Sequence, residues 1–401
     1  MQGAYTRDRE SQRGIVAQET NIGMLKEKMK GERRVALTPS SVGALVSQGF
    51  NVFVERGAGF QCFFEDREYV EAGARIVDRA DEIIGRSKLI IKVSPLLPWE
   101  CERLVPNQIV MGFMHMAVAS EASVREIIGK KITVIGYEII EDEDGRLPVL
   151  LPMSEIAGQV CVQIAAHYLQ GDQGGRGVLV GGMPGVPPAV FVIAGAGVVG
   201  REAARTALGL GAQVIVLDRE VDQLRKIDEL FGKRVQTAVI SKHNLEKAVT
   251  FADAFIGSVL VHGEKSPVLI TREMLKTMKK GSVIVDVSID QGGCIETSRP
   301  TSPEEPIFIE EGVIHYCVPF IPSLVGRTAT RALSNATLPY VSEVAELGID
   351  EALKRNGELA RGVYFYKGRC VKETLSQTFG IGCTPLGEML EGRVWMDDYS
   401  L

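Results

Sequence analysis

A glycine-rich hexapeptide, Gly195-Ala196-Gly197-Val198-Val199-Gly200, restricts the possible fold of this chain more than any other sequence feature. It follows the apolar run AVFVIA, opens the helical pattern VVGREAARTALGL and precedes a second apolar run, QVIVL. In a strand, turn, helix and strand of this kind, Gly195 permits the tight turn, Gly197 lets a pyrophosphate approach the backbone, and Gly200 lets the helix pack on the strand. The segment therefore predicts a dinucleotide-binding turn in an α/β domain, with Val199 in the first turn of the helix.

Asp218 ends the second apolar run, eighteen residues after Gly200. Dinucleotide-binding domains place there the carboxylate that accepts hydrogen bonds from the adenosine ribose hydroxyls. A carboxylate repels a 2′-phosphate, so Asp218 favours NAD over NADP, although the neighbouring Arg219 keeps NADP open as an alternative. A glycine-rich turn without a ligand is the simpler interpretation, but it does not require strand, turn, helix and acidic residue at this spacing.

The overall composition narrows the class of protein and of partner. The net charge is −6, and no run of five or more basic residues occurs, which argues against nucleic-acid binding. The seven cysteines form no CxxC pair. This pattern favours neither a disulfide framework nor a thiolate metal site, so we predict no metal and a reducing, cytoplasmic location.

The segment 177–200 carries no charge and is long enough to span a bilayer. It belongs to the most glycine-rich part of the chain, because nine of the 43 glycines lie between Gly174 and Gly200. Pro184, Pro187 and Pro188 also interrupt it. These residues predict a turn cluster between two short buried strands, 178–180 and 189–194, and no membrane helix.

Short apolar runs alternate with helical patterns along most of the chain, which is typical of mostly parallel sheets covered by helices. We therefore expect an α/β protein with two Rossmann-like, doubly wound domains and a cleft between them. Residues 1–21 are polar and are expected to form a disordered extension. The first domain is expected to combine 22–150 with 325–401, and the second, 151–324, to bind NAD.

The expected elements follow from these patterns. Strands of the first domain are predicted at 22–25, 51–55, 74–77, 88–93, 108–114 and 132–139. Strands of the second are predicted at 189–194, 213–217, 254–258, 282–287 and 313–318. Helices are predicted at 39–48, at 154–169 with Ser154 as the N-cap, and at 329–346.

Several long segments identify the chain as a member of the alanine dehydrogenase family, whose relatives include the NAD-binding subunit of proton-translocating transhydrogenase. The resemblance runs from residue 22 to about 392 and includes KGERRVALTPSSV, MSEIAGQVCVQIAAHYL, VDVSIDQGGCIETSRPT and LSNATLPYV. It implies oxidative deamination of L-alanine to pyruvate and ammonia with NAD, and the reverse reductive amination. It also implies a homo-oligomer, usually a hexamer, and a substrate domain built from both ends of the chain.

The resemblance assigns roles to individual residues. It places Arg34 on the substrate carboxylate, His115 as the proton donor and acceptor, and Asp290 as the second catalytic residue. Without it, Arg34 is typical of a solvated surface, His115 of a hydrogen-bonded core histidine and Asp290 of a turn. The NAD contacts that the resemblance implies are Ser154, Asp218, Val259, Leu260, Asp290 and Arg299.

Two departures from the family pattern concern the substrate. The family usually has K-V-K-E-P where this chain has Lys92-Val93-Ser94-Pro95. A gap-free count puts Ser94 on the substrate-contacting lysine, whereas a one-residue gap would let Lys92 serve. Phe320 stands where the family usually has an asparagine near the nicotinamide. A related imine or amino-acid reductase therefore stays open, as does a transhydrogenase-like NAD-binding module, although that subunit lacks the histidine found here at 115.

Overall fold

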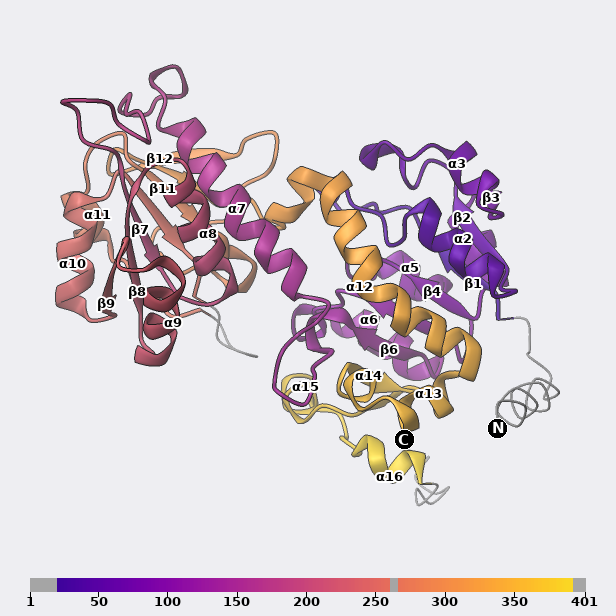
Figure 1. The fold of residues 1–401 in the computed structure, drawn as a ribbon. Coiled ribbons are helices and arrows are strands. Elements are labelled where there is room, and N and C mark those ends of the chain that lie inside the picture. The colour runs from indigo at the N-terminus through magenta and orange to yellow at the C-terminus, as the bar shows by residue number, and fades with distance from the viewer. Residues whose placement is uncertain (1–19, 260–265, 392–401) are drawn as a thin grey trace, which may run out of the picture. The chain divides into compact units, whose positions relative to one another are not determined.

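The computed structural model describes residues 20–259 and 266–391, and the chain divides into two compact units (Figure 1). One unit joins the described residues of Met1–Leu150 to those of Gly326–Leu401. The other is Leu151–Val325. The expected cleft between the two units stays a prediction.

Within the described residues, the first unit contains an eight-stranded sheet in the order β15-β14-β6-β5-β4-β1-β2-β3. β1 to β6 pair in parallel, whereas β14 pairs antiparallel with both β6 and β15. The strands are β1 (Ile22–Met24), β2 (Val52–Glu55), β3 (Arg75–Val77), β4 (Leu89–Ile91), β5 (Ile109–Gly112), β6 (Thr133–Gly136), β14 (Val363–Tyr366) and β15 (Arg369–Cys370). The strand order reverses between β1 and β4, and open α/β sheets bind ligands at the carboxyl ends of such neighbours.

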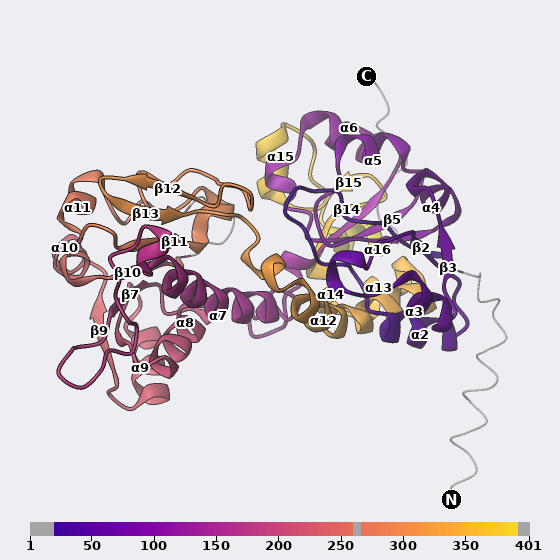
Figure 2. The same ribbon diagram turned by 90° about the horizontal axis from the view of Figure 1, so that it is seen from above.

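Helices cover both faces of this sheet, as Figure 2 shows. They are α2 (Pro39–Ser47), α3 (Asp66–Glu71), α4 (Ala80–Arg86), α5 (Pro98–Arg103), α6 (Glu121–Gly129), α12 (Gly326–Leu347), α13 (Ile349–Arg355), α14 (Gly357–Arg361), α15 (Glu373–Phe379) and α16 (Leu386–Leu390). Ile83 of α4 and Ile127 of α6 pack with Ile90 and Val110 of the sheet in one hydrophobic core. α12, which follows the second unit in sequence, packs against α2 near the N-terminus.

The described part of the second unit contains a seven-stranded sheet in the order β12-β13-β11-β10-β7-β8-β9, parallel except for the β12–β13 pair. Its strands are β7 (Val190–Ala194), β8 (Gln213–Asp218), β9 (Val235–Val239), β10 (Ala254–Gly257), β11 (Val283–Asp286), β12 (Ile307–Glu310) and β13 (Val313–Tyr316). Here the order reverses between β7 and β10. The glycine hexapeptide follows β7, so it lies at the position where such sheets bind nucleotides.

Alternate residues of these strands build two cores, one on each face. Phe191 and Ile193 of β7 pack with α7 (Leu151–Tyr168), α8 (Val198–Gly209) and α9 (Val221–Phe231). Val192 and Ala194 pack with α10 (Lys242–Phe251) and α11 (Arg272–Thr277) on the other face (Figures 1 and 2). The prediction of two α/β, mostly parallel, doubly wound domains is thus confirmed.

Three details of the sequence prediction were wrong. Residues 178–180 form no strand, and Leu179 is 67% exposed, because glycine weakens a strand and each neighbouring proline lacks the N–H group that a strand needs. α7 begins at Leu151, so Ser154 lies within the helix rather than at its N-cap. Asn21, expected in the disordered extension, accepts hydrogen bonds from the backbone N–H groups of Lys88 and Leu89. Residues 1–19 lie outside the described residues.

Four strands were not among those predicted, namely β9, β12, β14 and β15. The predicted strand 132–139 ends early, because Tyr137–Ile139 forms a 3-10 helix.

None of the helices in 20–259 and 266–391 is both long enough and apolar enough to cross a lipid bilayer.

Candidate active site

Arg34 lies in the loop between β1 and α2, at the carboxyl-terminal edge of the first sheet, and is only 5% exposed. Its guanidinium donates to both carboxylate oxygens of Glu32, from Nε to Oε1 at 2.8 Å and from Nη2 to Oε2 at 2.6 Å. Such a two-pronged ion pair fixes the plane of the guanidinium. Arg34 is therefore held in a defined orientation inside the unit rather than on the solvated surface.

Two hydroxyl groups of α12 hold the chain that follows Arg34. The Val35 N–H donates to Oγ1 of Thr330 at 3.1 Å, and the Thr38 N–H donates to Oγ of Ser334 at 3.0 Å. Thr38 in turn caps α2 by accepting from the Ser41 N–H. The C-terminal segment thus positions the Arg34 loop, although about 300 residues separate them along the chain.

Lys92 follows β4 and is almost completely buried, at 1% exposure. Its ammonium contacts Oε1 of Glu100 at 2.7 Å and Oε2 of Glu27 at 3.6 Å. Burial alone would lower the pKa of Lys92, but the charges of Glu27 and Glu100 outweigh burial and raise that pKa. Lys92 is therefore a charged lysine committed to two carboxylates.

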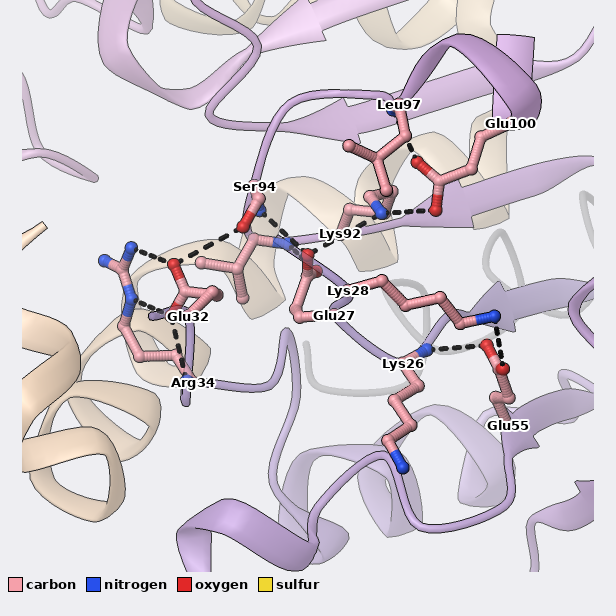
Figure 3. A network of polar contacts seen from close by, with 11 residues as sticks. Lys26, Glu27, Lys28, Glu32, Arg34, Glu55, Lys92, Ser94, Leu97 and Glu100 are labelled. Atoms are coloured by element: carbon pink, nitrogen blue, oxygen red, sulfur yellow. Dashed lines mark hydrogen bonds and ion pairs between the residues drawn. The ribbon is translucent and has the colours of Figure 1, made fainter. Parts of the chain in front are cut away.

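Ser94 is buried beside the Arg34–Glu32 pair, and its hydroxyl donates to Oε2 of Glu32 at 3.4 Å. Figure 3 shows the hydroxyl of Ser94 directed toward Glu32 while the Lys92 ammonium reaches toward Glu100. The structure thus brings Arg34 and Ser94 together through Glu32 and directs the ammonium of Lys92 elsewhere.

His115 follows β5 and has a left-handed backbone, with φ of 43° and ψ of 47°. Glu138 stabilises this uncommon conformation, because its carboxylate accepts from the N–H groups of His115 at 2.6 Å and Met114 at 3.1 Å. The imidazole stacks with the Phe113 ring at 6.3 Å, and the Arg34 guanidinium lies 5.8 Å from the same ring. Phe113 therefore links His115 to Arg34 within one site.

The glycine turn of the second unit has the shape that a bound pyrophosphate requires. Gly195 has φ of 104°, and a Cβ there would lie 2.5 Å from the carbonyl oxygen of Ser258. A Cβ on Gly200 would lie 1.8 Å from the carbonyl oxygen of Gly195. At the exposed Gly197, by contrast, a Cβ would meet no atom of the described residues within 4 Å. The turn therefore suits a dinucleotide, with open space at Gly197, before the N-terminus of α8.

Asp218 ends β8 beside this turn, and backbone groups orient its carboxylate. Oδ2 accepts from the Ala196 N–H at 2.6 Å, and Oδ1 accepts from the Glu220 N–H at 2.8 Å. Val199 lies in the first turn of α8, where its carbonyl oxygen would be 2.4 Å from a Cβ on Gly158 of α7. Ser154 lies four residues before Gly158 on α7 and is half-buried.

The other expected cofactor residues follow β10, β11 and β13. The Val259 carbonyl accepts from the hydroxyl of Ser288 at 2.8 Å, while Leu260 lies outside the described residues. Asp290 is exposed in the 3-10 helix Val287–Gln291, and its Oδ1 accepts from the Phe320 N–H at 3.2 Å. Arg299 is exposed and lies 4.1 Å from the Phe308 ring.

Phe320 has φ of 58°, a left-handed conformation that favours Asn and Gly over an aromatic residue. Asn is also the residue that the family usually has here. We expect Phe320→Asn to exceed Phe320→Leu in free energy of unfolding by about 1 kcal/mol, because both remove the ring but only Asn relieves the backbone. Thermal unfolding of the two variants measures this difference, and equal stability would contradict the backbone explanation.

The sequence did not single out four glutamates that lie near the expected site residues, namely Glu27, Glu32, Glu100 and Glu138. Glutamates in charged segments such as KEKMKGERR are typical of solvated loops, so no local signal marks Glu27 and Glu32 as buried. The sequence shows only that Glu27 and Glu138 closely follow β1 and β6 and that Glu100 lies in the first turn of α5.

The comparisons with known proteins agree with this geometry. Residues 23–157 match the model of the alanine dehydrogenase/PNT N-terminal domain, and residues 161–373 match that of the C-terminal domain. Alanine dehydrogenase of Methanococcus maripaludis is 43% identical over 370 residues, 92% of this chain and 99% of its own. The Mycobacterium tuberculosis enzyme is 42% identical over 369 residues, covering 92% of this chain and 99% of its own.

Solved structures give the same relationship. An L-alanine dehydrogenase structure superposes with a TM-score of 0.86 at 44% identity, covering 90% of this chain and 99% of its own. A transhydrogenase from Sinorhizobium meliloti superposes with a TM-score of 0.75 at 26% identity, covering 88% of this chain and 99% of its own. With both domain models matched and such relatives aligned over nearly their full length, the chain belongs to the alanine dehydrogenase/PNT family.

Proposed function

We propose that this protein is an alanine dehydrogenase, which oxidatively deaminates L-alanine to pyruvate and ammonia with NAD and catalyses the reverse reductive amination. The observation that carries the proposal is that Arg34 and His115 both lie near the ring of Phe113, at the carboxyl-terminal edge of the first sheet. A guanidinium for the substrate carboxylate beside an imidazole for proton transfer is the pair that amino-acid oxidation needs.

On the substrate side, Arg34 would bind the carboxylate of alanine or pyruvate. Glu32 already fixes the plane of the guanidinium, so little rotational freedom is lost on binding. His115 would take a proton when water adds to the imine carbon and return one when ammonia leaves. Ser94 offers a hydroxyl next to the Arg34–Glu32 pair, at a position where the family usually has the ammonium group of a lysine.

On the cofactor side, the turn at Gly195 and Gly197 and the N-terminus of α8 would hold the pyrophosphate of NAD. Bound NAD would supply the acceptor for the hydride of the substrate Cα–H. Ser154, Val259, Leu260, Arg299 and Phe320 are proposed as further contacts of this cofactor. Asp290, whose carboxylate is exposed, would stabilise the positive charge that develops during oxidation.

Asp218 is proposed to select NAD over NADP. We expect Asp218→Ala to weaken NAD binding about tenfold or more and to raise the preference for NADP, because the ribose hydroxyls lose their acceptor and the 2′-phosphate loses a repelling charge. The ratio of the two affinities, measured by fluorescence titration, is the informative quantity, since a merely loosened turn would weaken both cofactors equally. Asp222→Ala, at an exposed position on α9, is the control, and an unchanged ratio would contradict this assignment.

Two other activities remain to be separated by experiment. Ser94 and Phe320 favour a related imine or amino-acid reductase with a different substrate, and a panel of L-amino acids and 2-oxo acids with ammonia distinguishes it from an alanine enzyme. The likeness to a transhydrogenase favours an NAD-binding module without dehydrogenase activity. In that case NAD would bind but no member of the panel would be oxidised. We further propose a cytoplasmic homo-oligomer, a hexamer by family resemblance.

A further inference from the structure

Glu27 connects the buried Lys92 to the backbone of the substrate loop, which is the segment Val93–Ser94 after β4. Its Oε1 accepts from the Val93 N–H at 2.6 Å, and its Oε2 accepts from the Ser94 N–H at 3.3 Å (Figure 3). The Lys92 ammonium lies 3.6 Å from the same Oε2. One carboxylate therefore bridges the ammonium to the two peptide groups that place the Ser94 side chain.

Glu100, the other carboxylate at Lys92, has a different role. Its Oε1 accepts from the ammonium at 2.7 Å, and its Oε2 accepts from the Leu97 N–H at 2.8 Å, at the start of α5. In the hydrogen bonds of the described residues, Glu100 does not contact residues 93 or 94. The two carboxylates thus share one cation, but of the two only Glu27 connects this cation to the backbone of the substrate loop.

The surroundings of Glu27 explain why a cation is needed there. The carboxylate is buried beside two other acidic groups, Glu32 and Glu100, and burial raises its pKa while Lys92 opposes the rise. A carboxylate accepts charge-assisted hydrogen bonds from backbone N–H groups only while it is ionised. Without a neighbouring cation, the carboxylate would take up a proton more readily and bind the two N–H groups less strongly.

We infer that Lys92 is a positioning residue, which keeps Glu27 ionised and thereby fixes the Val93–Ser94 backbone, and that Ser94 rather than Lys92 faces the substrate. The ammonium is directed to Glu27 and Glu100, whereas the Ser94 hydroxyl reaches the Glu32–Arg34 pair. This inference rests on the proposed function, since the substrate is the one that Arg34 would bind.

A double-mutant cycle on Lys92 and Glu27 tests the inference. We expect Lys92→Met and Glu27→Gln each to raise the KM for pyruvate about tenfold while kcat and the KM for NADH change less than about threefold, because substrate placement rather than chemistry is disturbed. The KM for pyruvate of the double variant should be no higher than that of Lys92→Met alone, since both changes disrupt the same series of contacts. Glu100→Gln, the matched control, should raise the KM for pyruvate less than about twofold.

Several results would overturn the inference. If Glu27→Gln leaves the KM for pyruvate unchanged while Lys92→Met raises it, Lys92 contacts the substrate itself. Effects that multiply in the double variant would lead to the same conclusion, and an unchanged KM in both single variants would remove any role for the pair.

If Lys92→Met does not fold, Glu27→Asp replaces it as the test variant. The shorter carboxylate keeps its charge but withdraws from the two N–H groups, so an unchanged KM for pyruvate would again contradict the inference. A wild-type enzyme that is silent with every amino acid and 2-oxo acid would instead refute the proposed function, and the inference with it.

Discussion

Replacing His115 by Asn is expected to lower kcat for alanine oxidation by about 10²–10⁴-fold, because an amide cannot accept and return the proton that imine hydrolysis moves. Asn is the informative replacement since it tolerates the left-handed backbone of residue 115, where φ is 43°. The hydrogen bonds from the N–H groups of Met114 and His115 to Glu138 do not involve the imidazole and remain available in the variant. Steady-state NADH formation measures the loss.

His243→Asn provides the matched control for this prediction. His243 is exposed on α10 of the second unit, and it lies in none of the segments that carry the family resemblance. The control should keep wild-type kcat, and both variants should bind NAD as the wild type does. A His115→Asn enzyme with kcat within about threefold of the wild type would exclude this histidine as the proton carrier.

Replacing Arg34 by Met is expected to cause two separable losses. The kcat/KM for alanine should fall by about 10²–10³-fold, because the substrate carboxylate loses a charge-assisted, two-pronged partner. The free energy of unfolding should fall by about 3 kcal/mol, because Glu32 is buried and loses the guanidinium that binds both its oxygens. Activity and thermal unfolding are measured on the same preparation.

A second substitution separates the two losses. Arg34→Met combined with Glu32→Gln removes the buried charge along with its partner, so it should recover much of the stability but none of the activity. Arg34→Lys should also remain impaired, since an ammonium cannot make the paired bonds that a guanidinium makes. Recovery of kcat/KM in the double variant would show that Arg34 acts through stability and not through the substrate.

The sequence predicted the sheets well where burial determines the residue pattern. Runs such as VFVIA in β7 and LII in β4 lie almost entirely in the interior, and fully buried parallel strands are read directly from continuous apolar runs. The glycine hexapeptide was predictable because Gly195 and Gly200 each meet a backbone constraint that no other residue satisfies, while Gly197 leaves open space at the turn. Strand β15 was missed because it has only two residues and lies at the sheet edge. Strand β14 was missed although its run VYFY is mostly buried, because so short an apolar run does not distinguish a strand from a helix.

The candidate site was only partly predictable, for a different physical reason. Arg34, His115 and Asp290 came from the family resemblance, because an isolated Arg, His or Asp has no local pattern that separates a site from a surface. The choice between Lys92 and Ser94 depended on Glu27 and Glu100, and Glu27 lies 66 residues before Val93, to which it is hydrogen-bonded. Contacts across such separations follow from the sheet order, in which β1 lies beside β4.

The most direct test of the central claim is the stoichiometry of the reaction with L-alanine. The purified protein is incubated with L-alanine and NAD, and NADH, pyruvate and ammonia are each quantified over time. We expect equimolar formation of the three products, and consumption of NADH when pyruvate and ammonia are supplied instead. An enzyme that binds NAD but forms no NADH from L-alanine, and consumes none with pyruvate and ammonia, would contradict this claim.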